Sequence, residues 1–165
     1  MAVKKSNKKS GSSVHGNLQG ELQKRQVFDD PRQEAYLNLV RTHNLLSSQF
    51  AKLFKQHGVS DSQYNALRIL SGHGEPMHIH QIAERMVAPQ TDISRLIVRL
   101  DKAGLIKREP CGDDRRVTWI QLTAKGKSLL KKLDQPVRQL HASQFSGLTK
   151  REISQLNDLL FRSRG

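Results

Sequence analysis

Apolar residues recur at steps of three and four along most of this chain, which is the spacing that predicts amphipathic helices. The first such run begins at Pro31, stops before Gly58, and predicts a helix of about 26 residues. Ser60 and Gln63 then form a capping-box pattern at the start of a second helix, which ends near Gly72. Two amphipathic helices are therefore expected to open the folded part of the chain.

Two shorter helical patterns follow, separated by a break of about four residues at Val87-Ala88-Pro89. The first is the segment HIHQIAERM, and the second ends at Gly104. The apolar side of the second consists of Ile93, Leu96, Ile97 and Leu100. This arrangement matches a helix-turn-helix, although an ordinary helical hairpin has the same pattern.

The next segment decides between these two interpretations. Residues 105–109 and 117–122 are rich in β-branched and aromatic side chains, and the polar residues 110–116 between them predict a hairpin turn. A helix-turn-helix followed by a hairpin with a basic tip is a winged helix. A further helix begins at Thr123 and contains Pro136, where a kink or local break is expected.

The predicted fold class is α+β, mostly α, with long helices at both ends of a winged helix-turn-helix. We expect a flexible basic tail at residues 1–28 and a single domain at residues 29–165. Within that domain, the winged helix-turn-helix covers about residues 60–123. The helices at about 31–57 and 124–163, the last opening with a capping box at Thr149, have more apolar face than a small winged domain needs. The simplest use for this surface is the interface of a homodimer.

The net charge of the chain indicates what kind of partner it binds. The 165 residues carry a formal net charge of +13, with a pI near 10.3, which favours a polyanion as partner. Residues 1–25 hold +5 and residues 125–165 hold +6, whereas residues 77–124 hold only +2. The chain has one cysteine, no apolar run that could span a membrane, and no apolar stretch after its basic start that would indicate a secretory signal. We therefore expect a cytoplasmic protein without membrane contact.

Three motifs in the second half of the chain resemble those of one protein family. They are R-L-x-x-x-G-L-I at Arg99–Ile106, D-R-R at Asp114–Arg116, and L-T-x-x-G at Leu122–Gly126. Their order and spacing are similar to the recognition helix, wing and following helix of the MarR family of bacterial transcriptional regulators. The resemblance implies a homodimer that binds pseudo-palindromic, double-stranded operator DNA and is released by a small-molecule effector or by oxidation. It favours a repressor over an activator.

The resemblance places the DNA-reading surface on Gln90, Thr91, Asp92, Ser94 and Arg95. These residues lie off the apolar side of their predicted helix, at the N-terminal end that such helices point toward base edges. Ser94 and Arg95 are the leading candidates, because Arg can donate two hydrogen bonds to guanine and Ser can contact either a base or a phosphate. Asp92 either accepts from a cytosine amine or stabilises the start of the helix, and we favour the structural role.

Other DNA contacts are expected from the wing and its surroundings. Arg115 and Arg116 can reach the minor groove or its phosphates. The resemblance suggests that Asp114 orients the wing through an ion pair with Arg99. Phosphate contacts that add affinity without specificity are expected from the N-terminal tail and from Lys102, Lys107 and Arg108.

A small-molecule site is less well defined by the sequence. In similar proteins it lies between the first two helices and the winged domain, where the residues Tyr36, His43, His57, Tyr64 and Arg68 are candidates. The same residues are equally compatible with ordinary packing. Cys111 is either a redox sensor in the wing or an ordinary loop residue, and the second interpretation is favoured because the sensing cysteine of similar proteins lies near the first helix.

No catalytic or metal-binding pattern is found, so neither an enzyme nor a cofactor is expected. The sequence has no Gly-rich phosphate loop, no G-x-S-x-G elbow and no H-E-x-x-H, and the pair His78 and His80 does not have a known ligand spacing. Two other functions compete with a sequence-specific regulator. One is a non-specific architectural nucleic-acid-binding protein that relies on its basic ends, and the other is a family member that mainly binds a protein or a ligand.

Overall fold

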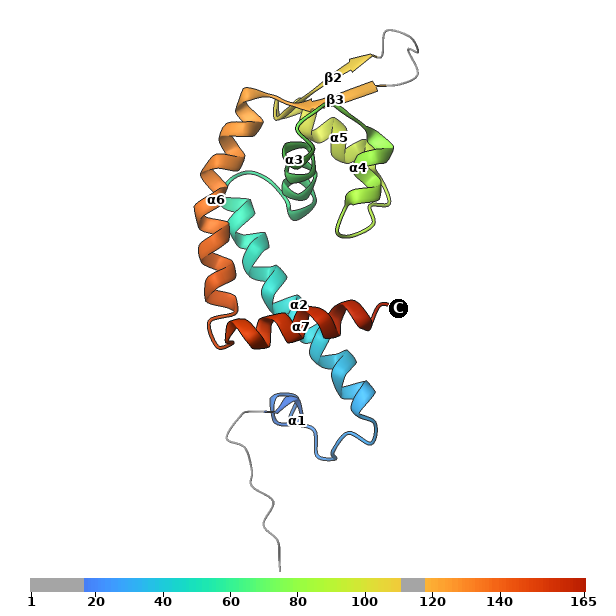
Figure 1. The fold of residues 1–165 in the computed structure, drawn as a ribbon, viewed down its shortest axis with the longest axis vertical. Helices are drawn as coiled ribbons and strands as arrows, with labels where there is room; N and C mark the ends of the chain where they lie inside the picture. Colours follow the sequence, from blue (N-terminus) through green and yellow to red (C-terminus); the bar gives the residue numbers. More distant parts are fainter. Residues whose placement is uncertain (1–16, 111–117) are drawn as a thin grey trace, which may run out of the picture. The chain divides into compact units, whose positions relative to one another are not determined.

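The computed structural model describes residues 17–110 and 118–165, which form mostly helices and one small sheet (Figure 1). In chain order the elements are α1 (Leu18–Glu21), α2 (Pro31–Gln56), α3 (Asp61–His73), β1 (Met77–His78), α4 (Ile79–Arg85), α5 (Ile93–Lys102), β2 (Ile106–Pro110), β3 (Thr118–Leu122), α6 (Ala124–Gln144) and α7 (Lys150–Arg162). The predicted α+β class is confirmed. No helix in the described ranges is long and apolar enough to cross a membrane.

The chain divides into two compact units, Met1–Leu45 and Leu46–Gly165. The described part of the first contains α1 and the beginning of α2. Part of the tail predicted for residues 1–28 lies in α1, where Leu18 is buried and the Asn17 side chain accepts a hydrogen bond from Gly20 N. A four-residue helix is too short to show a hydrophobic period in the sequence.

The start of α2 agrees with its sequence. Pro31 is the first helical residue, and the Asp30 carboxylate accepts a hydrogen bond from the backbone N–H of Arg32 at 2.8 Å. The Arg32 guanidinium also bonds to this carboxylate and lowers the pKa of Asp30.

In the second unit, α3, α4, α5, the sheet and α6 enclose one hydrophobic core. Its completely buried members come from every one of these elements and include Leu67, Met77, Ile82, Leu100, Ile120 and Leu133. The apolar side of α5 predicted from the sequence is confirmed, because Leu96, Ile97 and Leu100 are buried there. The helix-turn-helix is therefore held by burial of apolar surface from four helices and a sheet.

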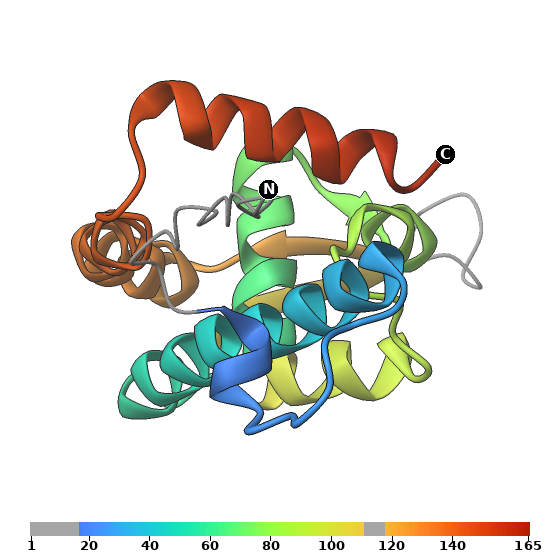
Figure 2. The same ribbon diagram turned by 90° about the horizontal axis from the view of Figure 1, so that it is seen from below.

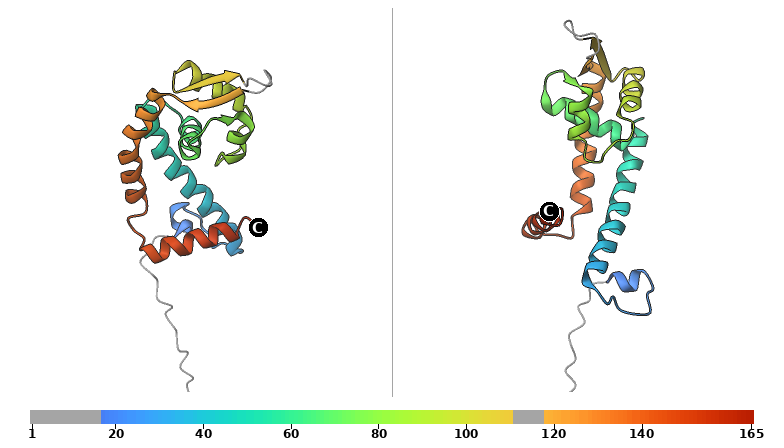
Figure 3. Two further views of the ribbon diagram at one scale, coloured as in Figure 1. Left: turned by 45° about the horizontal axis from the view of Figure 1, so that its top comes forward. Right: turned by 90° about the vertical axis from the view of Figure 1, so that its right-hand side faces the viewer.

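The sheet has three antiparallel strands in the order β1-β3-β2. Strands β2 and β3 form the predicted hairpin, with Ile106 opposite Leu122, and β3 leads directly into α6 (Figure 3). The sequence analysis missed β1, in which Met77 pairs with Ile120. Two residues are too few to show the alternation of a strand, so this strand exists only because β3 lies beside it.

The C-terminal end of α5 is closed by a Schellman motif. The backbone N–H of Leu105 donates to the Leu100 carbonyl at 3.0 Å, and that of Gly104 donates to the Asp101 carbonyl at 2.8 Å. Gly104 has a φ of +68°, a left-handed conformation that glycine adopts without steric cost. Leu105 and Leu100 are both buried, as this motif favours. The R-L-x-x-x-G-L-I pattern is thus the sequence of a helix end.

Three donors at the start of α6 bind the carbonyl groups of residues 103–105, which follow directly after α5. Lys125 Nζ donates to the Ala103 carbonyl at 2.7 Å, and the Thr123 hydroxyl donates to the Gly104 carbonyl at 2.7 Å. The backbone N–H of Thr123 donates to the Leu105 carbonyl at 3.1 Å. We call residues 103–105 and 123–126 the α5–α6 junction.

Gly126 permits the close approach of backbone at this junction. A Cβ atom at Gly126 would overlap the Leu105 carbonyl oxygen and would lie 3.1 Å from Leu122 Cδ2. The backbone N–H of Gly126 donates to the Thr123 hydroxyl at 3.1 Å, which caps α6. In the L-T-x-x-G pattern, Thr123 therefore caps α6 and donates a hydrogen bond to the Gly104 carbonyl, and Gly126 leaves room for the backbone of residue 105.

The long C-terminal helices differ from the prediction in one respect. Of the kink or local break expected at Pro136, the break does not occur, because α6 runs without interruption from Ala124 to Gln144. The expected capping box at Thr149 and Glu152 is confirmed, and its hydrogen bonds from Thr149 lower the pKa of Glu152. Figure 2 shows α6 nearly end-on and α7 along its length, so the two helices run in different directions.

Replacement of Gly126 by alanine tests the close approach at the junction. We expect Gly126→Ala to lower the free energy of unfolding by about 2 kcal/mol or more, because the backbone of residue 105 must move away. Gly72→Ala is the matched control, since Gly72 lies in α3 with nothing within 4 Å of its Cβ position, and we expect it to raise stability by about 0.5–1 kcal/mol. Urea unfolding followed by circular dichroism measures both, and equal effects would refute the packing argument.

Candidate nucleic-acid interface

Helix α5 begins at Ile93, later than the resemblance implied. Gln90 and Thr91 therefore lie in the turn before the helix, which corrects their placement on the recognition helix. The Gln90 side-chain amide donates to the Ala88 carbonyl at 3.1 Å, within the same turn. Asp92 is the N-cap of α5, and its carboxylate accepts a hydrogen bond from the backbone N–H of Arg95 at 2.9 Å. The structural role favoured for Asp92 is confirmed.

The turn of the helix-turn-helix runs from the end of α4 to Asp92 and is longer than the predicted four residues. It is attached to α3 by a hydrogen bond from the backbone N–H of Val87 to Asn65 Oδ1, at 3.0 Å. Asn65 is a positioning residue that the sequence analysis missed. No local signal marks it, because its partner is 22 residues away.

One side of α5 is free of the core and carries the predicted reading residues. Ser94, Arg95 and Arg99 are exposed, whereas the opposite side is buried. Arg95 Nε pairs with the Asp92 carboxylate at 2.9 Å while 79% of the Arg95 side chain remains exposed. An exposed pair of this kind has a small net stability, so Arg95 can exchange Asp92 for another partner at little cost.

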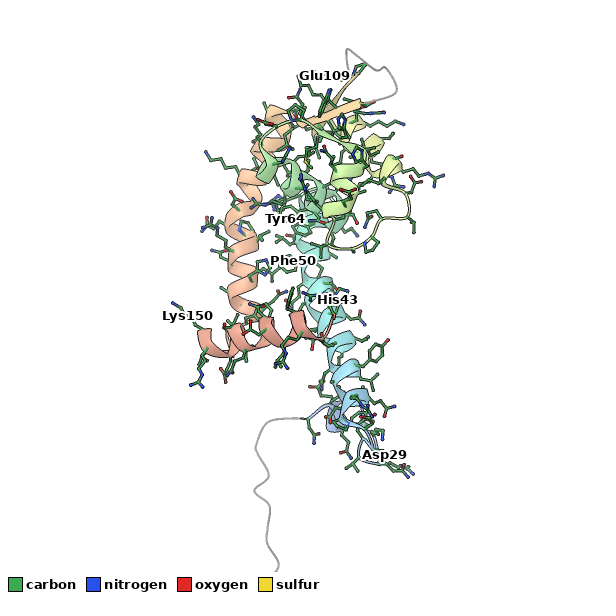
Figure 4. All side chains as sticks on the ribbon, turned by 45° about the vertical axis from the view of Figure 1, so that its right-hand side comes forward. Asp29, His43, Phe50, Tyr64, Glu109 and Lys150 are labelled. Atoms are coloured by element: carbon green, nitrogen blue, oxygen red, sulfur yellow. The ribbon has the colours of Figure 1, made fainter. Side chains whose placement is uncertain are left out.

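The described part of the wing is formed by β2 and β3. Glu109, near the end of β2 (Figure 4), accepts hydrogen bonds from Lys107 Nζ at 2.6 Å and from Gln121 Nε2 at 3.0 Å. The bond from Lys107 is the main cause of the lowered pKa of Glu109. Arg108 and Lys102 are exposed. The remaining wing predictions, for Cys111, Asp114, Arg115, Arg116 and the pair of Asp114 with Arg99, lie outside the described residues.

Two of the residues considered for a small-molecule site participate in packing of the second unit. The Tyr64 ring stacks on Phe54 with centroids 4.3 Å apart, and Tyr64 and Phe50 lie on the sides of their helices that face α6 (Figure 4). Burial is the main cause of the raised pKa of Tyr64. Arg68, one turn further along α3, forms an ion pair with Asp134 of α6 at 3.0 Å. Both residues therefore have structural partners in the absence of a ligand.

The other candidates are distributed elsewhere. Tyr36 and His43 belong to the first unit, where both are exposed. His57 follows α2 and lines a pocket in the second unit. Within residues 17–110 and 118–165, no three His, Cys, Asp or Glu side chains are grouped so that they could hold a metal ion.

A helix-turn-helix on a shared core, followed by an antiparallel hairpin, defines the class of winged helix-turn-helix domains. The sequence profile of the MarR family matches residues 57–117, which contain most of this arrangement. The chain belongs to the MarR family of transcriptional regulators.

Individual relatives agree with this assignment over most of their length. The HTH-type transcriptional regulator YkoM of Bacillus subtilis is 30% identical over 138 residues, 81% of this chain and 88% of YkoM. The transcriptional repressor IacR of Pseudomonas putida is 26% identical over 157 residues, 94% of this chain and 93% of IacR. The crystal structure of a MarR transcription factor from Planctomyces limnophilus is 43% identical, covers 81% of this chain and 98% of its own, and has a TM-score of 0.64.

Two substitutions at Asp92 separate its cap from its ion pair with Arg95. Asp92→Ala removes both and is expected to lower the free energy of unfolding by about 1 kcal/mol. Asp92→Asn keeps a capping oxygen and removes only the charge, so we expect a change of a few tenths of a kcal/mol at most. Thermal and urea unfolding compare the variants; an equal loss in both would assign the stabilisation to charge rather than to capping.

Proposed function

We propose that this protein is a transcriptional repressor that binds pseudo-palindromic operator DNA as a homodimer and is released by a small-molecule effector. The observation that carries the proposal is the exposed polar side of α5, with Ser94, Arg95 and Arg99, on a helix whose other side is part of the core. A rigid helix with a free N-terminal end is the element that a helix-turn-helix inserts into the major groove. Sco3205 of Streptomyces coelicolor, which has the same fold at 18% identity and a TM-score of 0.75, has been crystallised in complex with DNA.

We infer a division of contacts from the positions of these residues. Ser94 and Arg95 read bases, and Arg95 exchanges its bond to Asp92 for a guanine edge or a phosphate. Gln90 and Thr91, in the turn before α5, are better placed for phosphates than for base edges. The exposed Lys102 and Arg108 add contacts to the backbone of the DNA.

The wing completes the proposed interface. We infer that Arg115 and Arg116 enter the minor groove and that Asp114 orients them through Arg99, as the family resemblance implies. Lys107 is paired with Glu109 and, like Arg95, exchanges a surface carboxylate for a phosphate.

Exposed apolar side chains support the homodimer. In the first unit, Tyr36 and Leu39 on α2 are 65% and 46% exposed. In the second unit, α7 has no buried residue, and its Leu159 and Phe161 are 60% and 70% exposed. Apolar surface of this kind marks contacts with another protein. A symmetric dimer places two α5 helices about one turn of DNA apart, roughly 10 bp.

The named relatives support repression and release. IacR is named as a repressor, as is a homoprotocatechuate degradative operon repressor of Escherichia coli that is 24% identical. BpsR of Bordetella bronchiseptica has its DNA binding regulated by 6-hydroxynicotinic acid, and RdhR has been solved with 2,4-dichlorophenol bound. We propose the same kind of control for this chain.

Selection of duplexes from a random pool tests the function. We expect a palindromic consensus, and we expect Arg95→Ala to weaken binding to the selected duplex about tenfold while leaving binding to a scrambled duplex nearly unchanged. Arg138→Ala, an exposed arginine on α6, is the control and should leave both affinities unchanged. Electrophoretic mobility shifts at several salt concentrations measure each affinity.

The same assay identifies the competing function. Equal binding to selected and scrambled duplexes, with a steep salt dependence, would replace the proposal with a non-specific architectural role for the basic ends. A chain without residues 1–16 retains α1 and loses four lysines, so it should lose affinity for every duplex without a change in the consensus.

A further inference from the structure

A pocket of about 310 Å³ lies beside the α5–α6 junction, entirely within the second unit. Three segments line it: the turn between α2 and α3, the end of α5, and the first turns of α6. The lining residues are His57, Gly58, Val59, Ala103, Leu105, Lys125, Ser128, Leu129 and Lys132. This volume is at the lower end of the range found for small-molecule sites.

The charge of the lining has one sign. Lys125 and Lys132 are two turns apart on the same side of α6, and His57 lines the pocket from the turn between α2 and α3. No carboxylate lines the pocket. Within the described part of the chain, Lys132 forms no ion pair. Ammonium groups without acidic partners beside a concave surface attract an anion.

The rest of the lining is apolar. Val59 and Leu105 are buried, and Leu129 is half-buried beside them. A ligand that satisfies both parts of the surface carries one negative group and a compact apolar body. A bare inorganic anion would leave the apolar side chains of the lining in contact with water, and a neutral apolar molecule would leave the two lysines without an ion-pair partner.

We propose that this pocket binds a small organic carboxylate and that its occupancy weakens the attachment of α5 to α6. The binding half of the proposal stands alone, whereas the regulatory half rests on the proposed function. The link between the halves is Lys125, which lines the pocket and also donates to the Ala103 carbonyl at the end of α5. A carboxylate is a stronger acceptor for an ammonium group than a neutral carbonyl, so a bound carboxylate competes with the Ala103 carbonyl for Lys125 and weakens that bond.

This pocket differs from the small-molecule site implied by the family resemblance. Of the five residues considered there, only His57 lines it. Tyr64 and Arg68 have other partners in α2 and α6. The two locations are therefore distinguishable by experiment.

Titration of the full-length protein without DNA tests the binding half. The probes are benzoate, benzamide, which has the same shape without the charge, and acetate, which has the charge without the apolar ring. We expect benzoate to bind with a Kd on the order of 1 mM and the other two to bind about tenfold more weakly or not at all. Amide chemical-shift changes should concentrate at residues 57–59, 103–105 and 125–132, because these segments line the pocket.

Two neighbouring lysines provide the matched variants. Lys132→Gln should weaken benzoate binding about fivefold, whereas Lys131→Gln, which removes an exposed lysine of α6 that does not line the pocket, should leave it unchanged. Equal effects of the two variants, equal binding of benzamide and benzoate, or shift changes confined to Tyr64 and Arg68 would each overturn the assignment. A further outcome would also overturn it: no benzoate binding to the wild type, together with a loss of DNA affinity in Lys132→Gln. Lys132 would then be a contact to DNA phosphates rather than part of a carboxylate site.

The regulatory half is measured on the selected duplex. Saturating benzoate should lower the DNA affinity of the wild type at constant ionic strength, and DNA should lower the benzoate affinity by the same factor. In Lys132→Gln the benzoate concentration that gives half of the effect should rise about fivefold, in step with its weaker benzoate binding. Unchanged DNA affinity with benzoate bound would overturn the regulatory half. Absence of any sequence preference for DNA would contradict the proposed function and leave the benzoate measurements as they are.

Discussion

The hydrogen bonds between the end of α5 and the start of α6 determine how the hairpin and α6 are placed relative to α5. Three successive carbonyls, of residues 103–105, accept from Lys125 and Thr123, and the absence of a side chain at Gly126 lets the two backbones approach. Helix ends are where backbone groups lose their intrahelical partners, so an end that enters the protein interior needs partners from elsewhere. Here these partners come from the beginning of α6. The orientation of α5, the start of the hairpin and the direction of α6 are consequently specified at one place.

This junction explains why two separate sequence motifs are needed. The glycine and leucine after α5 form the Schellman motif that turns the chain into β2, while the threonine and glycine of α6 bind the carbonyls exposed by that turn. Strands β2 and β3 pair between the two motifs, so the hairpin begins and ends at the junction. Both strands of the hairpin are thereby attached at the C-terminal end of α5.

The other end of α5 is organised by electrostatics at the surface. The Asp92 carboxylate accepts from one of the free N–H groups at the start of the helix, that of Arg95, and pairs with the Arg95 guanidinium at the same time. An acidic residue beside Arg95, the arginine that we propose reads DNA, opposes a negatively charged partner, yet it stabilises the helix that carries this arginine. Most of the net charge of +13 lies outside residues 77–124. In the proposed function, attraction to DNA over long range is therefore a property of the chain ends, whereas selectivity belongs to a few side chains on α5 and the wing.

Local sequence determined the helices, the hairpin and the buried side of α5, because a helix or strand repeats its burial pattern over a few residues and a cap lies within one turn of its helix. It also carried the family motifs, whose residues are close together in the chain. Tertiary structure alone decided how the turn before α5 is held, since the backbone N–H of Val87 donates to Asn65 of α3, 22 residues away. It decided the existence of β1, which requires β3 as a partner more than 40 residues later. It also brought His57, Lys125 and Lys132 around one pocket, because contacts between distant segments leave no periodic trace in the sequence.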